Sequence, residues 1–156
     1  MEQPFLKDIQ HNQNIIYKVC NLYRDRHEDQ EDLFQEIVYQ LWKAYPGFKG
    51  ESKLSTWMYR IALNTAIAAY RKPKIDITYP EELPDHVHYS ADTNSSENEQ
   101  LLFRALRTLT DAEKAVISLY LEDYSYQEIA AITGLTESNV GVRLNRIKTK
   151  LKERLN

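Results

Sequence analysis

The histidines of this sequence are its best candidates for metal chemistry. His86 and His88 are two residues apart, and Asp85 and Asp92 flank them. A metal site needs ligands that a rigid element orients, and this polar segment offers neither a predicted helix nor a cysteine. The acidic residues of the chain fall in no phosphate-binding loop, nucleophile elbow or HExxH helix. We therefore expect no metal site, no cofactor and no catalysis by the chain itself.

Cationic residues are concentrated at the C-terminal end. Positions 135–156 carry six basic residues against Glu137 and Glu153, although the whole chain has a formal net charge of -3. The six are Arg143, Arg146, Lys148, Lys150, Lys152 and Arg154. Positions 74–99 carry seven acidic residues and one basic residue, so the acidity lies in the middle of the chain. A basic segment can neutralise phosphates and release counterions whatever the charge of the whole chain.

The basic end starts with the pattern of a helix-turn-helix, YQEIAAITGLTESNVGVRLNRI. Ala130 is small where a second helix approaches, Gly134 can end the first helix with a positive φ, and Val140 can pack beneath. Thr136 can cap the second helix, whose outward face is polar and basic, as in helices that enter a major groove. The residues expected to contact duplex DNA are Ser138, Asn139, Val142, Arg143, Asn145, Arg146 and Lys148. The competing interpretation is a helical-hairpin interaction module with a solvated basic end.

A second polar stripe follows the segment KLSTWMYRIALNTAIAAYRK. Thr56, Arg60, Asn64 and Arg71 are spaced to share one helix face, and Trp57 and Tyr59 flank them. Cations interleaved with aromatic rings suit single-stranded nucleic acid, whose phosphates attract charge and whose bases stack. For Trp57 itself, burial in the core is the favoured reading, because large aromatic residues on helices are mostly buried.

These residues need helices to position them, and the sequence predicts an all-α fold of two small domains. Helical periodicity is expected over 12–24, from Asp29 to Pro46 and over 55–71. Residues 1–73 then form one domain, 74–96 an acidic flexible linker, and 97–156 a second domain. Three S/T-x-x-E capping boxes mark helix starts in the last third, at Ser96, Thr110 and Ser125. No apolar run reaches the ~20 residues of a membrane span and no leader is evident, so we expect a cytoplasmic protein.

Three segments together resemble an extracytoplasmic function (ECF) sigma factor of bacterial RNA polymerase, in the sigma-70 family. They are DLFQEIVYQLW, then FKGES followed by TWMYRIALNTA, then LTDAEKAVISLYLEDYSYQEIAAITGL. The resemblance covers both domains in the family order. It implies a sigma factor that binds core RNA polymerase and directs promoter-specific transcription initiation. It also implies promoter DNA, both duplex and melted, as a ligand and an anti-sigma factor as a further partner.

The resemblance assigns roles to particular residues. It implies that Asp32, Gln35 and Glu36 dock on the polymerase, and that the C-terminal domain reads the minus-thirty-five element as duplex. The residues that correspond to minus-ten binding and capture of a flipped base are Phe48, Lys49, Gly50, Glu51, Ser52, Thr56, Trp57, Arg60 and Asn64. Gly141 and Val142 depart from the pattern, since members of the family commonly carry a basic or hydroxylic side chain there. A helical Gly141 also costs about 1 kcal/mol relative to Ala.

One alternative is a helix-turn-helix transcriptional regulator that does not join core polymerase. Its N-terminal half would then be an α/β receiver or a ligand-binding domain, whereas no alternating strand pattern precedes Asp29. Binding to purified RNA polymerase would separate the two.

Overall fold

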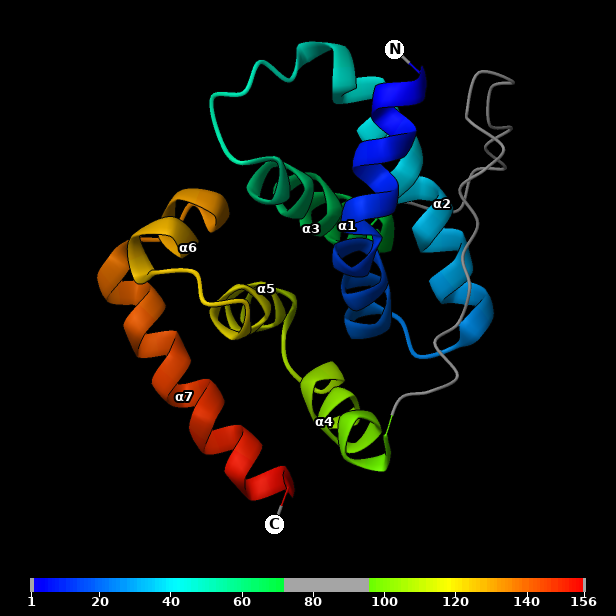
Figure 1. Ribbon diagram of the computed structural model, residues 1–156. Coiled ribbons are helices and arrows are strands. Elements are labelled where there is room, and N and C mark those ends of the chain that lie inside the picture. The colour runs from blue at the N-terminus through cyan, green and yellow to red at the C-terminus, as the bar shows by residue number, and fades with distance from the viewer. Residues whose placement is uncertain (1, 72–95, 156) are drawn as a thin grey trace. The chain divides into compact units, whose positions relative to one another are not determined.

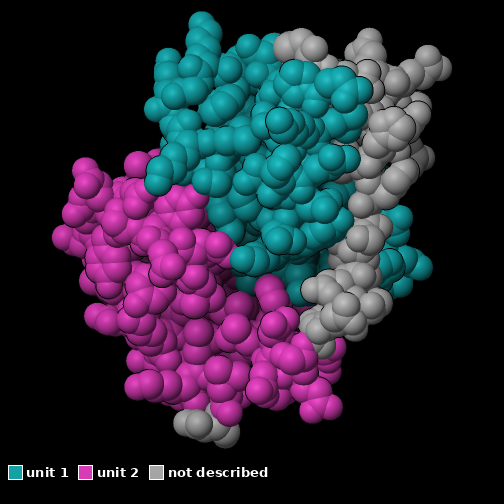
Figure 2. Space-filling model, in the orientation of Figure 1, with its two compact units in different colours: residues 1–91 teal, residues 92–156 magenta. Residues whose placement is uncertain are grey.

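The computed structural model describes residues 2–71 and 96–155 of the chain. The chain divides into two compact units, residues 1–91 and 92–156, shown in different colours in Figure 2. All regular structure in the described ranges is helical, which confirms the predicted all-α class. The division falls inside the segment 74–96 that the sequence predicts as a linker, and the ends of that linker stay a prediction.

Over its described residues 2–71, unit 1 consists of three α-helices and one short 3-10 turn (Figure 1). They are α1 (Glu2–Tyr23), α2 (His27–Ala44), η1 (Tyr45–Gly47) and α3 (Leu54–Arg71). Each of the three helices contacts the other two, so one core forms between them. Its largest fully buried side chains include Ile16, Phe34, Ile37, Leu41 and Met58. On α2, Phe34, Ile37 and Leu41 recur at helical spacing, and burial of such an apolar stripe stabilises a helix in the bundle.

The first helix begins ten residues earlier than the predicted range 12–24. Phe5 and Ile9 are 0% and 1% exposed, so an additional apolar stretch supports the extension. Asn12 interrupts the regular backbone at φ -122° and ψ 15°, and its side chain donates a hydrogen bond to the carbonyl of Asp8 at 2.9 Å. The Asn12 side chain thus competes with the backbone for the carbonyl of Asp8 at the point where the helix departs from regular geometry. The helix is therefore continuous but kinked.

The turn between α1 and α2 is held by buried polar contacts. Gln30 is 8% exposed and donates to Asn21 Oδ1 at 3.2 Å and to the carbonyl of Arg24 at 3.0 Å. Arg24 donates through Nη2 to the carbonyl of Ala66 on α3 at 3.2 Å. The sequence offers Asp29 as the cap and start of the second helix, and this is wrong, because α2 already begins at His27. Arg24 also donates through Nη1 to the carbonyl of Tyr23 at 2.9 Å, which satisfies a carbonyl group at the C-terminal end of α1.

The described part of unit 2, residues 96–155, contains four helices, and each of them starts at its capping signal. They are α4 (Glu97–Arg107), α5 (Asp111–Leu121), α6 (Tyr126–Thr133) and α7 (Glu137–Leu155). Reciprocal capping boxes pair Thr110 with Glu113 and Ser125 with Glu128. At Ser96 the structure has one half of the box, since its hydroxyl accepts from the backbone N–H of Glu99. The capping residues of this sequence thus determine where these helices begin.

The last helix completes the core of unit 2. α7 contacts α4, α5 and α6, and its residues Val140, Leu144 and Ile147 are fully buried. Lys150 reaches back to α5, where its Nζ lies 2.8 Å from Glu113 Oε2 and 3.0 Å from Oε1. Glu113 therefore closes the α5 cap and also binds α7. The same carboxylate thus takes part in the capping box of α5 and in the packing of α5 against α7.

Candidate nucleic-acid interface

The loop that follows η1 is fixed at both of its ends. Phe48 donates its backbone N–H to the carbonyl of Tyr45 at 3.0 Å, and its ring centroid lies 4.8 Å from that of Trp57. At the other end, the backbone N–H of Trp57 donates to the carbonyl of Lys53 at 3.0 Å. Between these anchors, the four residues Lys49, Gly50, Glu51 and Ser52 are exposed. The loop therefore presents polar side chains and backbone groups to solvent, while both of its ends are held in place.

Gly50 gives this loop its turn. Its φ is +75°, and a Cβ built there would meet nothing within 4 Å. The backbone conformation, rather than lack of space, requires glycine, because a side chain in the left-handed region costs about 1–2 kcal/mol.

An aromatic cluster packs next to the anchored ends of this loop. The ring centroid of Tyr45 lies 5.2 Å from that of Phe5 and 6.3 Å from that of Trp57, and Phe5 lies 4.9 Å from Trp42. The Tyr45 hydroxyl donates to Asp8 Oδ2 at 2.8 Å. Burial raises the pKa of Tyr45, and the hydrogen bond and negative charge of Asp8 raise it further. Sequence reasoning missed Phe5 and Asp8, although the helical spacing of Phe5, Ile9 and Ile16 was a usable signal.

The polar stripe of α3 lies beside the loop in the sequence and is partly exposed. Arg60 and Asn64, one helical turn apart, are both exposed, and Thr56 is half-buried. Trp57 is half-buried against Phe48, while Tyr59 is 2% exposed and belongs to the core. Arg71 ends α3, and its side chain lies outside the described residues. The stripe therefore reduces to two exposed polar side chains close in sequence to an exposed loop.

The acidic face of α2 differs among its three members. Asp32 is exposed, whereas Gln35 and Glu36 are half-buried. Glu36 accepts a hydrogen bond from Gln40 Nε2 at 3.1 Å, one turn further along the same helix. Spacings of three and four residues place all three side chains on one side of α2. The face offers one free-standing carboxylate and one that a neighbouring amide orients.

The helix-turn-helix of unit 2 forms with the predicted turn. Gly134 ends α6 with φ 81° and ψ 7°, and the Thr136 hydroxyl accepts from the backbone N–H of Asn139 at 3.1 Å to cap α7. Ile129, Val140, Leu144 and Ile147 are fully buried beneath it, and Ile132 and Leu135 are half-buried. The exposed residues of the predicted DNA face are Ser138, Asn139, Val142, Asn145, Arg146 and Lys148.

Two cations of this face are restrained within unit 2. Arg143 is partly shielded from solvent, and Lys148 contacts a tyrosine. Arg143 is half-buried, and its Nε is a buried atom without a hydrogen-bond partner. Lys148 Nζ lies 4.8 Å from the centroid of the Tyr120 ring and 3.4 Å from its hydroxyl. Arg146 has no such restraint and extends from an exposed position. Arg146 is therefore the most accessible cation in the middle of α7.

The described residues contain no group of three side chains that could hold a metal ion. His86, His88, Asp85 and Asp92 lie outside the described residues. Burial raises the pKa of the Cys20 thiol, which keeps it protonated and unreactive. No helix in the described ranges is long and apolar enough to cross a membrane.

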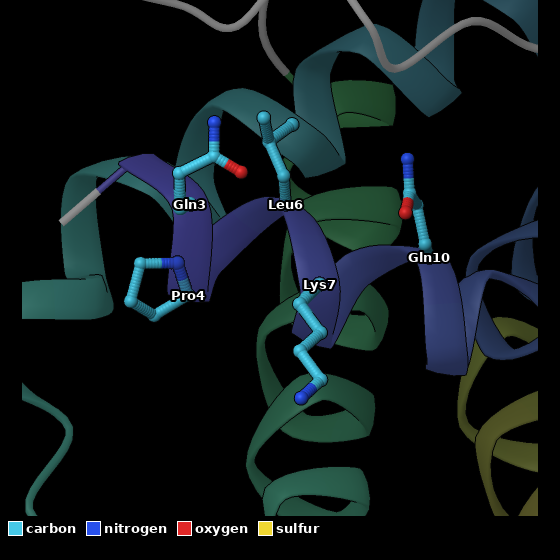
Figure 3. A pocket seen from close by; sticks show the side chains of 5 residues that line it. All are labelled: Gln3, Pro4, Leu6, Lys7 and Gln10. Carbon is cyan, nitrogen blue, oxygen red and sulfur yellow. The ribbon is translucent and has the colours of Figure 1, made fainter.

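A shallow hollow on unit 1 offers no alternative site. It is lined by Gln3, Pro4, Leu6, Lys7 and Gln10, all from the first turns of α1. In Figure 3 the Lys7 side chain extends to the side opposite those of Gln3 and Gln10, so its polar groups do not converge. A ligand site needs convergent polar groups, and this hollow lacks them.

Comparison with known proteins matches both units. The Sigma-70 region 2 family matches residues 9–74, and the Sigma-70, region 4 family matches residues 99–151. The ECF RNA polymerase sigma-E factor of Escherichia coli strain K12 is 31% identical over 134 residues, covering 77% of this chain and 70% of that protein. The ECF RNA polymerase sigma factor SigG of Mycobacterium tuberculosis is 31% identical over 151 residues. That alignment covers 79% of this chain but only 41% of SigG, so the chain spans about two fifths of this relative.

Two solved structures share the fold. The sigma factor RpoE from Bartonella quintana, determined in complex with the anti-sigma factor NepR, aligns with a TM-score of 0.73 at 21% identity. This alignment covers 98% of the present chain and 97% of that one. CnrH in complex with the cytosolic domain of CnrY aligns with a TM-score of 0.68 at 19% identity, covering 99% and 89% of the two chains.

Proposed function

Because the chain belongs to the extracytoplasmic function sigma factors of the sigma-70 family, we propose that it binds core RNA polymerase and directs promoter-specific transcription initiation. In this proposal unit 1 docks on the polymerase and opens the minus-ten element, and unit 2 reads the minus-thirty-five element. The chain performs no catalysis of its own and acts in the cytoplasm, where the polymerase works. Chemistry belongs to the polymerase, and this chain supplies recognition.

The observation that carries the proposal is the anchored, exposed loop beside the α3 stripe. Its ends are held by Phe48 on Trp57 and by the Lys53 carbonyl, and Asn64 and Arg60 are exposed on the following helix. A loop that is anchored at both ends and surrounded by exposed polar groups suits capture of a nucleotide that has left the duplex. Binding energy from the captured base offsets the few kcal/mol of unstacking and unpairing, so opening needs no ATP.

Polymerase docking is assigned to Asp32, Gln35 and Glu36. Asp32 supplies an accessible carboxylate, and the Gln40 amide keeps the Glu36 carboxylate in one orientation. A fixed negative face of this kind favours a basic surface on the partner and sets its register.

Duplex binding is assigned to α7. This helix carries six basic and two acidic residues, so it is cationic within a chain of net charge -3. Exposed Ser138, Asn139, Asn145 and Arg146 can reach base edges or phosphates from its outward face. Arg143 turns part of its guanidinium away from solvent and Lys148 is held over Tyr120, so Arg146 is the first candidate for a phosphate or base contact.

An anti-sigma factor is a further proposed partner. Both of the solved structures described above are of a chain bound to a second protein, and the RpoE structure holds an anti-sigma factor. The alternative of a helix-turn-helix regulator that does not join polymerase is not favoured. Such a regulator needs an α/β receiver or a ligand pocket, whereas the described part of unit 1 is a three-helix bundle.

Transcription in vitro tests the proposal. The full chain is added to purified core polymerase with a genomic promoter library, and run-off products that depend on the chain are sequenced. Asp32→Lys should abolish both polymerase binding and transcription, while the exposed Glu153→Lys, with the same change of charge in unit 2, should leave polymerase binding intact. Binding of duplex DNA by the wild-type chain without any binding of core polymerase would support the regulator instead.

A further inference from the structure

The apolar member of the α7 face stands out from its surroundings. Val142 is 48% exposed, and the assigned face residues three and four positions away are polar: Ser138, Asn139, Asn145 and Arg146. On a helix these spacings put all four around the valine on the same surface. Valine has lower helix propensity than most polar residues and gains nothing from exposure to water. Nothing in residues 96–155 of unit 2 therefore explains an aliphatic side chain at the centre of this face.

The position beside Val142 is also open. Gly141 lies in the second turn of α7, where glycine destabilises a helix by about 1 kcal/mol relative to alanine. A Cβ added there would meet only Tyr126, whose Cε2 lies at 3.4 Å, an ordinary van der Waals distance. Internal packing does not require a glycine at this position. Gly141 adds no side chain beyond the backbone next to Val142. The neighbour of Gly141 is the ring of Tyr126, which is 43% exposed.

Gly141, with the Tyr126 ring beside it, and the exposed Val142 next to it are non-polar positions in a polar, cationic face. In the major groove, the apolar group that a base edge presents is the C5 methyl of thymine. A low backbone at Gly141 permits close approach to the groove floor. The stiff valine side chain has one dominant rotamer in a helix, so its ordering on contact costs little entropy.

From this arrangement we infer that Val142 reads a thymine methyl group in the duplex upstream element, with Gly141 providing clearance. The inference rests on the proposed function, since it requires α7 to lie in the major groove of promoter DNA. The cationic character of α7 supplies the attraction to phosphates, and Val142 supplies discrimination of one base.

Selection and methyl removal test the inference. Holoenzyme made with the full chain selects from promoters randomised at the minus-thirty-five element, and we expect one position to be restricted to thymine. Replacing that thymine by deoxyuridine removes only the methyl group. It should weaken wild-type binding about fourfold, the change that ~0.8 kcal/mol for one buried methyl corresponds to.

The variants make the assignment specific. Val142→Ala should bind the thymine and deoxyuridine duplexes within twofold of each other, because the partner of the methyl is gone. The matched control is Leu121→Ala, which trims another exposed aliphatic residue of unit 2 outside α7 and should keep the fourfold difference. Equal binding of both duplexes by wild type, or an undiminished difference in Val142→Ala, overturns the inference while selective promoter binding leaves the proposed function standing. Absence of any selected upstream element overturns both.

Discussion

Replacing Glu113 by glutamine would test how unit 2 holds α7 in place. Glu113 Oε1 accepts from the backbone N–H of Thr110 at 3.0 Å and from Lys150 Nζ at 3.0 Å, and Oε2 accepts from Lys150 Nζ at 2.8 Å. A glutamine keeps the shared oxygen and therefore the capping box. It loses the Oε2 contact and the negative charge that Lys150 faces. The substitution isolates the ion pair from the local cap.

The size of the effect follows from these contacts. Hydrogen bonds to charged groups contribute about 1.5–3 kcal/mol, and neutral ones about 1 kcal/mol. The Glu113 side chain is 8% exposed, but that of Lys150 is 41% exposed and can be partly rehydrated, so the lower part of the range applies. We expect Glu113→Gln to lower the free energy of unfolding of unit 2 by about 1–2 kcal/mol at pH 7. For a domain of this size each 1 kcal/mol corresponds to about 4–8 °C in Tm.

The tryptophans provide an internal control. Both of them, Trp42 and Trp57, belong to unit 1, so their fluorescence follows unfolding of that unit alone. Circular dichroism at 222 nm follows the helices of both units. In urea titrations of the full chain, Glu113→Gln should shift the part of the helical signal that belongs to unit 2. The fluorescence transition should stay where it is in the wild-type protein.

The pH dependence tests the electrostatic part of the reasoning. Burial raises the pKa of Glu113, but the hydrogen bonds from Lys150 and Thr110 outweigh it and lower the pKa below its ordinary value of 4.5. The stabilisation is therefore complete above pH 4.5 and is lost as the pH falls through the lower folded-state pKa. The difference between wild type and Glu113→Gln should shrink in acid. A difference that is equal at pH 7 and pH 3 would refute the role of the charge.

Three further predictions concern DNA and α7. Asn64→Ala should spare polymerase binding but impair promoter opening, because it removes a pocket contact, and a template with a premelted minus-ten bubble should restore transcription. The control Asp32→Lys should stay inactive on both templates. Permanganate footprints as strong as those of wild type on an intact promoter would contradict the prediction for Asn64→Ala. Arg146→Ala should weaken duplex binding, with a loss of discrimination of about 1–3 kcal/mol if it contacts a base edge, or an even loss with a reduced salt slope if it contacts phosphate; Arg154→Ala, at the far end of the same helix, is its control. Gly141→Ala should stabilise unit 2 by up to about 1 kcal/mol in thermal unfolding while weakening promoter binding, and a destabilised variant would show that the Tyr126 ring cannot accept the added methyl.

Local sequence signals determine much of this fold. The capping residues Thr110 and Ser125 and the turn glycine Gly134 determine helix ends through contacts within four residues, so their types and spacing suffice. Helical periodicity likewise places most of α2 and α3, because one apolar face must be buried. The predicted helix-turn-helix was confirmed on these grounds.

Contacts between residues distant in sequence followed from the tertiary structure alone. The docking of Phe5 on Trp42 and Tyr45, and the bond from Tyr45 to Asp8, join residues about forty positions apart to build the support of the exposed loop. No local propensity marks such a pairing, and the helix that carries Phe5 and Asp8 is kinked at Asn12.

The cations of α7 show the same division. By sequence, Arg143, Arg146 and Lys148 are equal candidates for the DNA face, and Lys150 is a further basic residue of the same helix. The structure buries the Nε of Arg143, places Lys148 over Tyr120, pairs Lys150 with Glu113 and leaves Arg146 exposed. Periodicity determined that this helix is amphipathic and cationic, because that depends on residue type alone. Which charge is available to a ligand was decided by the packing of α5 against α7, since only that packing brings Tyr120 and Glu113 within reach.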